Sequence, residues 1–178
     1  MFRRTAEILL GSVTVRRRLP QVVGRGVVVA SPKVGGLRYL FRTSENLDPV
    51  LFKVAHALVK PNDVVWDIGA NVGLFAAAAS GLAGRAGSIY TIEADKDAFL
   101  LLQRTANAQP ANHAPINCLN VALSSKCGVV RFNIAKRSRS ANYIEGFGST
   151  QTGGVAETRL VPSLNQTCCS QNFQCQAS

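Results

Sequence analysis

The sequence has few of the residues that build metal sites, disulfide frameworks and membrane spans. Only two histidines occur in 178 residues, and none of the five cysteines has the C-x-x-C spacing of a zinc site. We therefore predict no metal, and we expect His56 and His113 to be structural and the cysteines to be free thiols. No apolar run reaches the ~18 residues that a membrane helix needs, so we expect no membrane span.

We also expect no cleavable signal peptide. Residues 8–15 are apolar, but three arginines follow at positions 16–18 and no small-residue cleavage site is present. We therefore expect a cytoplasmic protein whose residues 1–20 form a basic N-terminal segment, weakly helical and ended by Pro20.

Acidic residues are scarce, and the net charge is +10. Nine Lys/Arg and one acid lie in residues 1–42, whereas residues 43–125 carry five bases and seven acids. Basic ends are compatible with nucleic-acid binding. However, the basic residues lack a regular aromatic pattern and form no known nucleic-acid module. We therefore predict a solvated basic face and no nucleic-acid partner.

The length and the 47% hydrophobic share indicate an ordered α/β protein. In residues 21–61, two β-rich runs flank a Pro/Gly turn and predict a hairpin of residues 27–30 with 37–41. Asp48-Pro49 then predicts a helix start, with the aspartate as cap and the proline in the first turn. This helix ends at Pro61, and its predicted apolar stripe consists of the residues that recur at helical spacing, namely Val50, Leu51, Val54, Ala57 and Leu58.

Residues 62–164 contain a β-α-β-α-β pattern, which is half of a doubly wound, Rossmann-like sheet. The following segment predicts a hairpin of residues 122–125 with 129–134, a polar loop over residues 135–155 and a strand over residues 157–161. The expected elements of the first part are strands 64–68, 88–92 and 116–121 and helices 72–82 and 96–107.

The loop after the first strand has a composition that favours one class of cofactor. Dinucleotide binders require G-x-G-x-x-G, but Asn71 and Leu74 occupy two of these glycine positions. The pattern is instead D-x-G-x-x-x-G, from Asp67 through Gly69 to Gly73. An aspartate would repel a pyrophosphate and suits a cationic ligand without phosphates, such as S-adenosylmethionine. Glu93, which follows the second strand, can then accept hydrogen bonds from both ribose hydroxyls.

These motifs together resemble an FkbM-type S-adenosylmethionine-dependent methyltransferase, from residue 27 to about residue 164. The resemblance rests on the lead-in at residues 51–61, the loop at residues 65–73, and residues 92–95 and 120–124. It implies methyl transfer to a hydroxyl of a small-molecule acceptor, a sugar or natural product. The implied cofactor-binding residues are Asp67, Gly69, Ala70, Asn71, Gly73, Glu93, Ala94, Val121 and Ala122.

The sequence departs from the family pattern near its C-terminus. The family continues with a strand that ends in Lys-Ile-Asp-Val-Glu-Gly, whereas here a polar tail follows over residues 165–178, which we expect to be disordered. The missing strand would lie beside strand 64–68. We therefore predict an incomplete fold, consisting of the cofactor half plus β-hairpins, with an exposed strand edge that allows self-association.

Two functions follow from this. The first is a methyltransferase, either active or a remnant that truncation has inactivated, and the alternative is a non-catalytic cofactor-binding or interaction fragment. No catalytic base can be named. The candidates for contacts with the acceptor are the polar residues Lys136, Arg137, Arg139, Asn142, Ser149 and Gln151.

Overall fold

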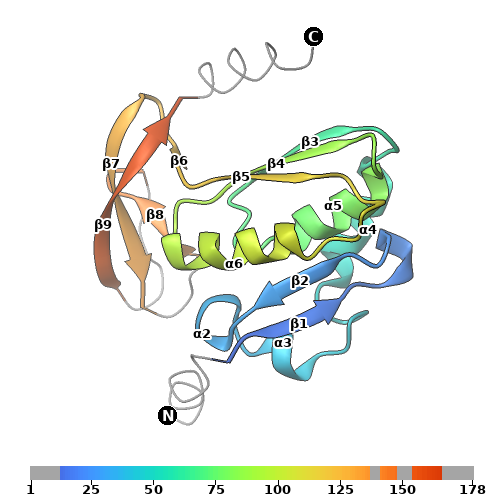
Figure 1. The fold of residues 1–178 in the computed structure, drawn as a ribbon. Helices are drawn as coiled ribbons and strands as arrows, with labels where there is room; N and C mark the ends of the chain where they lie inside the picture. Colours follow the sequence, from blue (N-terminus) through green and yellow to red (C-terminus); the bar gives the residue numbers. More distant parts are fainter. Residues whose placement is uncertain (1–12, 137–140, 148–153, 166–178) are drawn as a thin grey trace.

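The computed structural model describes residues 13–136, 141–147 and 154–165, which form a mixed α/β fold with a parallel sheet (Figure 1). The strands are β1 (Val15–Arg18), β2 (Val27–Ala30), β3 (Val64–Ile68), β4 (Ser88–Ile92), β5 (Ile116–Leu119), β6 (Ala122–Leu123), β7 (Gly128–Ala135), β8 (Tyr143–Ile144) and β9 (Val155–Leu164). The helices are η1 (Gln21–Val23), α2 (Pro32–Gly35), α3 (Arg38–Phe41), α4 (Pro49–Leu58), α5 (Leu74–Ala83) and α6 (Lys96–Asn107).

The parallel sheet has the strand order β3-β4-β5. Its three strands and the two connecting helices lie where the hydrophobic pattern predicts them, although β5 is two residues shorter than expected. Ile89 and Thr91 are fully buried on the face that α5 covers, and alanines 76–79 of α5 are fully buried too. Small side chains thus let this helix lie close to the sheet.

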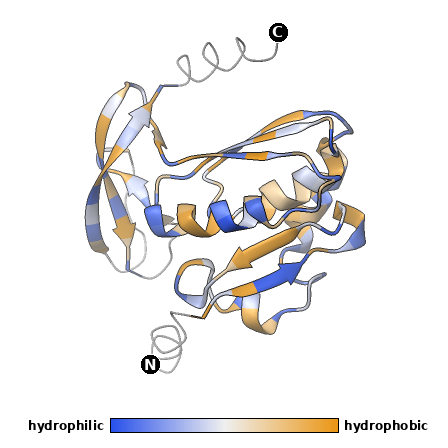
Figure 2. Ribbon diagram, in the orientation of Figure 1, coloured by the Kyte–Doolittle hydropathy of each residue, from blue (hydrophilic) through white to orange (hydrophobic). Residues whose placement is uncertain are grey.

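The helices α5 and α6 lie between the parallel sheet and a second, two-stranded layer (Figure 1). In that layer β2 pairs antiparallel with β1. Figure 2 shows that β2 is hydrophobic and β1 hydrophilic. Val28 and Ala30 are accordingly buried, whereas the arginines of β1 lie on the outer strand.

Two predictions for the N-terminal region are wrong. Val15–Arg18 is a strand and not part of a helix, and Leu37–Phe41 does not pair with β2, because Arg38–Phe41 is the helix α3. The turn at residues 31–36 contains the helix α2 instead of a hairpin connection. The strand β2 pairs instead with the upstream strand β1, from Val15 opposite Ala30 to Arg18 opposite Val27.

Helix α4 begins as predicted, but most of its predicted apolar stripe faces solvent, and only Leu51 of that stripe packs against the core. Asp48 caps it by accepting the N–H of Leu51 at 3.1 Å. The buried side chains are Phe52 and Ala55, and His56 is exposed, as expected. The predicted apolar stripe contains the most exposed hydrophobic residues of this helix, namely Val50 (71%), Val54 (44%) and Leu58 (69%).

The remaining strands form a second sheet with the order β6-β9-β7-β8. The predicted hairpin of residues 122–125 with 129–134 is wrong, because β9 lies between them and pairs parallel with β6 and antiparallel with β7. The predicted strand 157–161 is longer than expected, and the predicted loop 135–155 contains β8. Residues 137–140 and 148–153 of that loop, and the predicted tail beyond Asn165, lie outside the described residues.

Within the described part of the chain, no helix has the length and apolarity needed to cross a bilayer.

Candidate functional site

A cavity of about 320 Å³ lies where the carboxyl ends of β3 and β4 meet the second sheet. Ile68 and Gly69 come from the end of β3, and Ile92 and Glu93 from the end of β4. Because parallel strands end at the same edge, residues distant in the sequence converge here. The other lining residues are Asn71, Ala94, Val121, Ala122, Leu123, Phe132, Asn142, Tyr143 and Ile144.

The glycine loop is held to the end of β4 by backbone hydrogen bonds. The N–H groups of Gly69 and Ala70 both donate to the carbonyl of Ile92, at 2.8 and 3.0 Å. Gly69 and Asn71 have positive φ angles of 76° and 52°. The left-handed conformation turns the chain sharply from β3 into α5.

Glu93 joins this loop to the turn after β4. Its Oε2 atom accepts the N–H of Asn71 at 2.7 Å, and its Oε1 atom accepts the N–H of Asp95 at 2.7 Å. The side chain of Asn120 donates to the carbonyl of Glu93 at 2.7 Å, which fixes the same turn from the end of β5. A carboxylate has about four lone-pair sites, so both oxygens of Glu93 keep capacity for a ligand in the cavity.

Burial raises the pKa of the Glu93 carboxyl, and the N–H groups of Asp95 and Asn71 offset part of this rise because they favour the charged form. Only 8% of Glu93 is exposed. The carboxylate of Glu93 thus faces the cavity and is poorly solvated by bulk water.

Asp67 lies at the end of β3, partly buried beside the loop. Burial raises its pKa to about 6, the N–H of Ala76 in the first turn of α5 lowers it, and the charge of Glu93 raises it. The Oδ2 atom of Asp67 and the Oδ1 atom of Asn71 are buried, and neither has a hydrogen-bond partner in the protein. The loop therefore presents two acceptors that need donors.

Gly73 has a packing role instead of a place in the cavity. Its φ angle is 84°, and a Cβ atom there would lie 2.7 Å from Cδ1 of Leu102 on α6. Of the nine residues predicted to bind a cofactor, the cavity brings together Gly69, Asn71, Glu93, Ala94, Val121 and Ala122. It does not include Asp67, Ala70 or Gly73 among its lining residues.

The far wall of the cavity comes from the second sheet, through Phe132, Tyr143 and Ile144. Sequence reasoning missed these residues, because only the pairing of β7 with β8 brings them together. The alternation of apolar residues in β7 was the signal available. This wall is mostly apolar.

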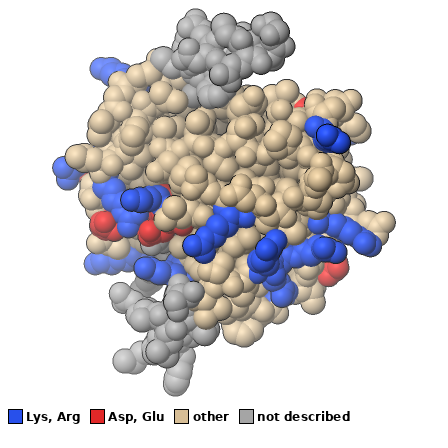
Figure 3. All heavy atoms as spheres, viewed as in Figure 1, with Lys and Arg blue, Asp and Glu red and all other residues tan. Residues whose placement is uncertain are grey.

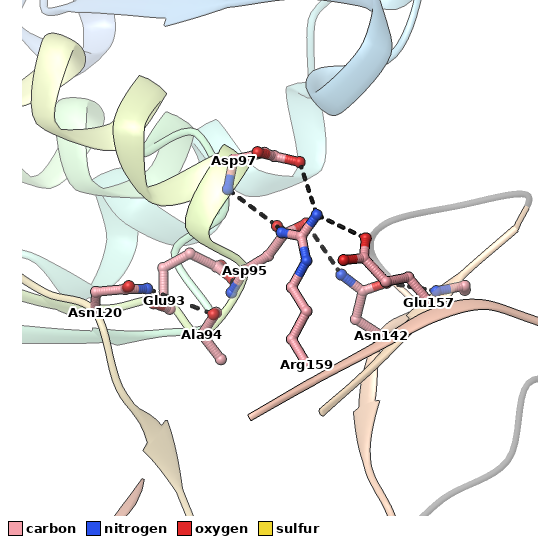
Figure 4. Close-up of polar contacts among 9 residues, drawn as sticks. Glu93, Ala94, Asp95, Asp97, Asn120, Asn142, Glu157 and Arg159 are labelled. Atoms are coloured by element: carbon pink, nitrogen blue, oxygen red, sulfur yellow. Dashed lines mark hydrogen bonds and ion pairs between the residues drawn. The ribbon is translucent and has the colours of Figure 1, made fainter. Parts of the chain in front are cut away.

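Asn142 also lines the cavity, but the protein uses both ends of its amide. Its Oδ1 atom accepts the N–H of Ala135 at 2.9 Å, and its Nδ2 atom donates to Oδ2 of Asp95 at 3.3 Å (Figure 4). Asn142 was predicted to contact the methyl acceptor. Its amide instead holds the second sheet in place. Lys136, another such candidate, is exposed and is not among the cavity residues, whereas Arg137, Arg139, Ser149 and Gln151 lie outside the described residues.

Arg159 of β9 completes the connection between the two sheets. Figure 4 shows its guanidinium among three carboxylates, those of Asp95, Asp97 and Glu157, at 3.3, 3.3 and 2.8 Å.

Within the described residues, no group of three or more His, Cys, Asp or Glu side chains is arranged to hold a metal ion.

Comparison with known proteins gives little further guidance. No family model matches the sequence, and no curated protein matches it. Among solved structures, the chain is similar to a protein-L-isoaspartate O-methyltransferase, with 17% sequence identity and a TM-score of 0.31. The match covers 60% of this chain and 28% of that protein, so this chain corresponds to well under half of its length. A similarity this weak does not identify a function.

Proposed function

We propose that the chain is an S-adenosylmethionine-binding protein of the FkbM type, with a Rossmann-like methyltransferase fold, that transfers a methyl group to a hydroxyl of a small molecule. The observation that carries the proposal is the polarity of the site. Glu93 is the one charged residue among the described lining residues, which include no Lys or Arg. Asp67 and Asn71 add two buried oxygens without donors.

This polarity selects among the ligands that glycine loops bind. A dinucleotide would bring a pyrophosphate close to Asp67 and Glu93, and the like charges would repel. S-adenosylmethionine has no phosphate, and it carries an ammonium, ribose hydroxyls and a positively charged sulfonium. Each of these groups suits an oxygen acceptor or a negative charge.

The residues present fit this cofactor. Asp67 and Asn71 would accept hydrogen bonds from its ammonium, and Glu93 would accept them from the ribose hydroxyls. Val121 and Ala122, which line the cavity, would contact the adenine, and Phe132 would close the apolar side. When bound, the cofactor supplies an activated methyl group, and the protein orients it and excludes water. We assign no catalytic base.

A second candidate function is cofactor binding without catalysis. It is favoured by the position of β3, which is an edge strand among the described residues. In doubly wound sheets, ligands meet in a crevice between neighbouring strand ends. No described strand lies on the outer side of β3 to complete that crevice. A methyl acceptor would therefore be enclosed on one side fewer than in a complete doubly wound sheet.

Isothermal titration of the full chain with S-adenosylmethionine and S-adenosylhomocysteine tests the proposal. We expect saturable binding, with an affinity at least about tenfold lower in Glu93→Gln because a charged acceptor is lost. Glu45→Gln, at an exposed glutamate outside the cavity, is the matched control. NAD should not bind. Binding of NAD alone, or no binding of either cofactor at millimolar concentration, would contradict the proposal.

A methyl-transfer assay then separates the two functions. Release of S-adenosylhomocysteine that requires a hydroxyl-bearing acceptor supports the enzyme. Cofactor binding without turnover across a panel of sugar and phenolic acceptors supports the non-catalytic alternative.

A further inference from the structure

Helix α4 carries a row of aliphatic side chains on its outer surface. Its inner side packs through Phe52 and Ala55 into the core cluster that includes residues of β2 and α5. Val50, Val54 and Leu58 are instead 71%, 44% and 69% exposed. Residues four apart lie about 40° apart around a helix, so these three side chains form one row. Single exposed apolar residues are ordinary, but a continuous row of them indicates an interaction surface.

Cations lie beside this row. Lys53 is exposed one turn after Val50, on the neighbouring side of the outer surface. Lys60 is exposed just past the end of the helix, and its Nζ atom donates to the carbonyl of Ala57 at 2.9 Å. Its ammonium therefore lies at the C-terminal end of the row. Residues 49–62 contain no Asp or Glu, so the surface is apolar and cationic.

The charge of the whole chain has the same sign. The net charge is +10, and Figure 3 shows Lys and Arg side chains spread over the lower half of the face that it draws, with far fewer acidic groups among them. Such a protein attracts anionic surfaces and repels a second copy of itself.

We propose that α4 docks the protein on the surface of an anionic lipid bilayer, with the helix axis parallel to the membrane plane. Val50, Val54 and Leu58 enter the boundary between the headgroups and the acyl chains. The ammonium groups of Lys53 and Lys60 lie at the level of the anionic headgroups. The contact is peripheral, since no helix in the described ranges is long and apolar enough to cross a bilayer.

A lipid surface fits this row better than a folded protein or a nucleic acid does. The row has no aromatic side chain and no hydrogen-bonding side chain, whereas protein interfaces depend on aromatic anchors and directional hydrogen bonds. Single-stranded nucleic acid requires aromatic rings for stacking. A fluid bilayer requires only apolar side chains at the right depth and cations at its surface.

Co-sedimentation of the full chain with lipid vesicles, at about 0.15 M salt, tests the proposal. We expect binding to phosphatidylcholine vesicles that contain phosphatidylserine, and much weaker binding to phosphatidylcholine alone. Leu58→Glu should weaken the binding at least about tenfold, because it removes an apolar anchor and brings an anion to the membrane.

Leu160→Glu is the matched control, because it makes the same change in charge at a leucine that is 73% exposed. Leu160 belongs to β9, which lies on the opposite side of the molecule from α4 (Figure 1). Its replacement should change the affinity less than about twofold, since charges away from the contact are screened.

Two further variants test the position and the charge of the surface. Val54→Glu, at the centre of the row, should act like Leu58→Glu. Lys53→Gln should weaken the binding about fivefold, whereas Lys126→Gln, at an exposed lysine outside α4, should have little effect. Circular dichroism establishes that each variant is folded.

The outcomes that would overturn the proposal are distinct. They include no binding to vesicles that contain phosphatidylserine, and equal losses in Leu58→Glu and Leu160→Glu, which would assign the attraction to net charge alone. A dimer in light scattering that Leu58→Glu abolishes would assign the row to a second copy. Binding of a single-stranded oligonucleotide that Leu58→Glu abolishes would assign it to nucleic acid. None of these results depends on whether a cofactor binds.

Discussion

The guanidinium of Arg159 lies 3.3 Å from the carboxylate of Asp95, and this ion pair joins β9 of the second sheet to the start of α6. Asp95 is 1% exposed and Arg159 is 25% exposed. The backbone N–H of Asp95 donates to Glu93, whose other oxygen holds Asn71. The ion pair thus connects the second sheet to the floor of the cavity through hydrogen bonds.

Replacement of Arg159 should destabilise the protein strongly. Arg159→Met leaves the carboxylate of Asp95 buried without its cation, and we expect the free energy of unfolding to fall by about 2–4 kcal/mol. Urea denaturation measures this change. In the control Arg131→Met, the lost pair with Glu145 is more than half exposed on both sides, and the cost should stay below about 1 kcal/mol. Equal losses in the two variants would show that the Arg159 cluster is not a structural connection.

Gly73→Ala should cost more stability than the same substitution at a glycine with a positive φ and open space around it. The alanine would need a positive φ, and its Cβ atom would lie 2.7 Å from Leu102 and 3.1 Å from Thr105. We expect a loss of about 2–4 kcal/mol in the free energy of unfolding. Gly84→Ala is the control, because Gly84 also has a positive φ but open space around it. Its expected cost is about 1 kcal/mol, and a Gly73 variant that loses no more than this would refute the packing argument.

The effect of Asp67→Asn on stability should depend on pH. Folding raises the pKa of Asp67 from 3.8 to about 6, so the folded state favours the neutral carboxyl. This favourable contribution is complete below pH 3.8 and is lost as the pH rises through 6. Asp67→Asn should therefore become stabilising relative to wild type as the pH increases, by at most about 3 kcal/mol above pH 7.

Thermal melts of both proteins at pH 4.5 and 7.5 measure that difference. Other titrating groups are present in both proteins and largely cancel, apart from Glu93, whose charge acts on Asp67. The affinity of the wild type for S-adenosylmethionine should fall below about pH 6, because only the charged Asp67 attracts an ammonium. A stability difference that does not change with pH would contradict the assignment of a raised pKa to Asp67.

The elements that the sequence predicts well are those with local signals. Helix α6 spans Lys96–Asn107, as expected from its apolar spacing, and Asp48 caps α4 as its position before a proline indicates. Strands β3 and β4 also match. Helical spacing misled in α4, where Val50, Val54 and Leu58 face solvent. An apolar stripe shows that a helix could bury one face, but not which element is available to cover it.

Strand pairing was the part that local signals could not supply. Both predicted hairpins named the wrong partner, since β2 pairs with the upstream strand β1 and β6 pairs with β9 some forty residues later. A period-two pattern identifies a strand and its two faces, but a neighbouring strand is chosen by packing in three dimensions. The wall formed by Phe132 and Tyr143 was missed for this reason.

The sequence by itself determined the strand-loop-helix around Asp67 and Gly69 and the acceptor at Glu93, because glycine placement, helix caps and apolar runs act over a few residues. Only the tertiary structure decided that Arg159 meets Asp95 and that Asn142 serves the scaffold. These features depend on groups tens of residues apart, whose contacts arise from the packing of the two sheets and not from local preference.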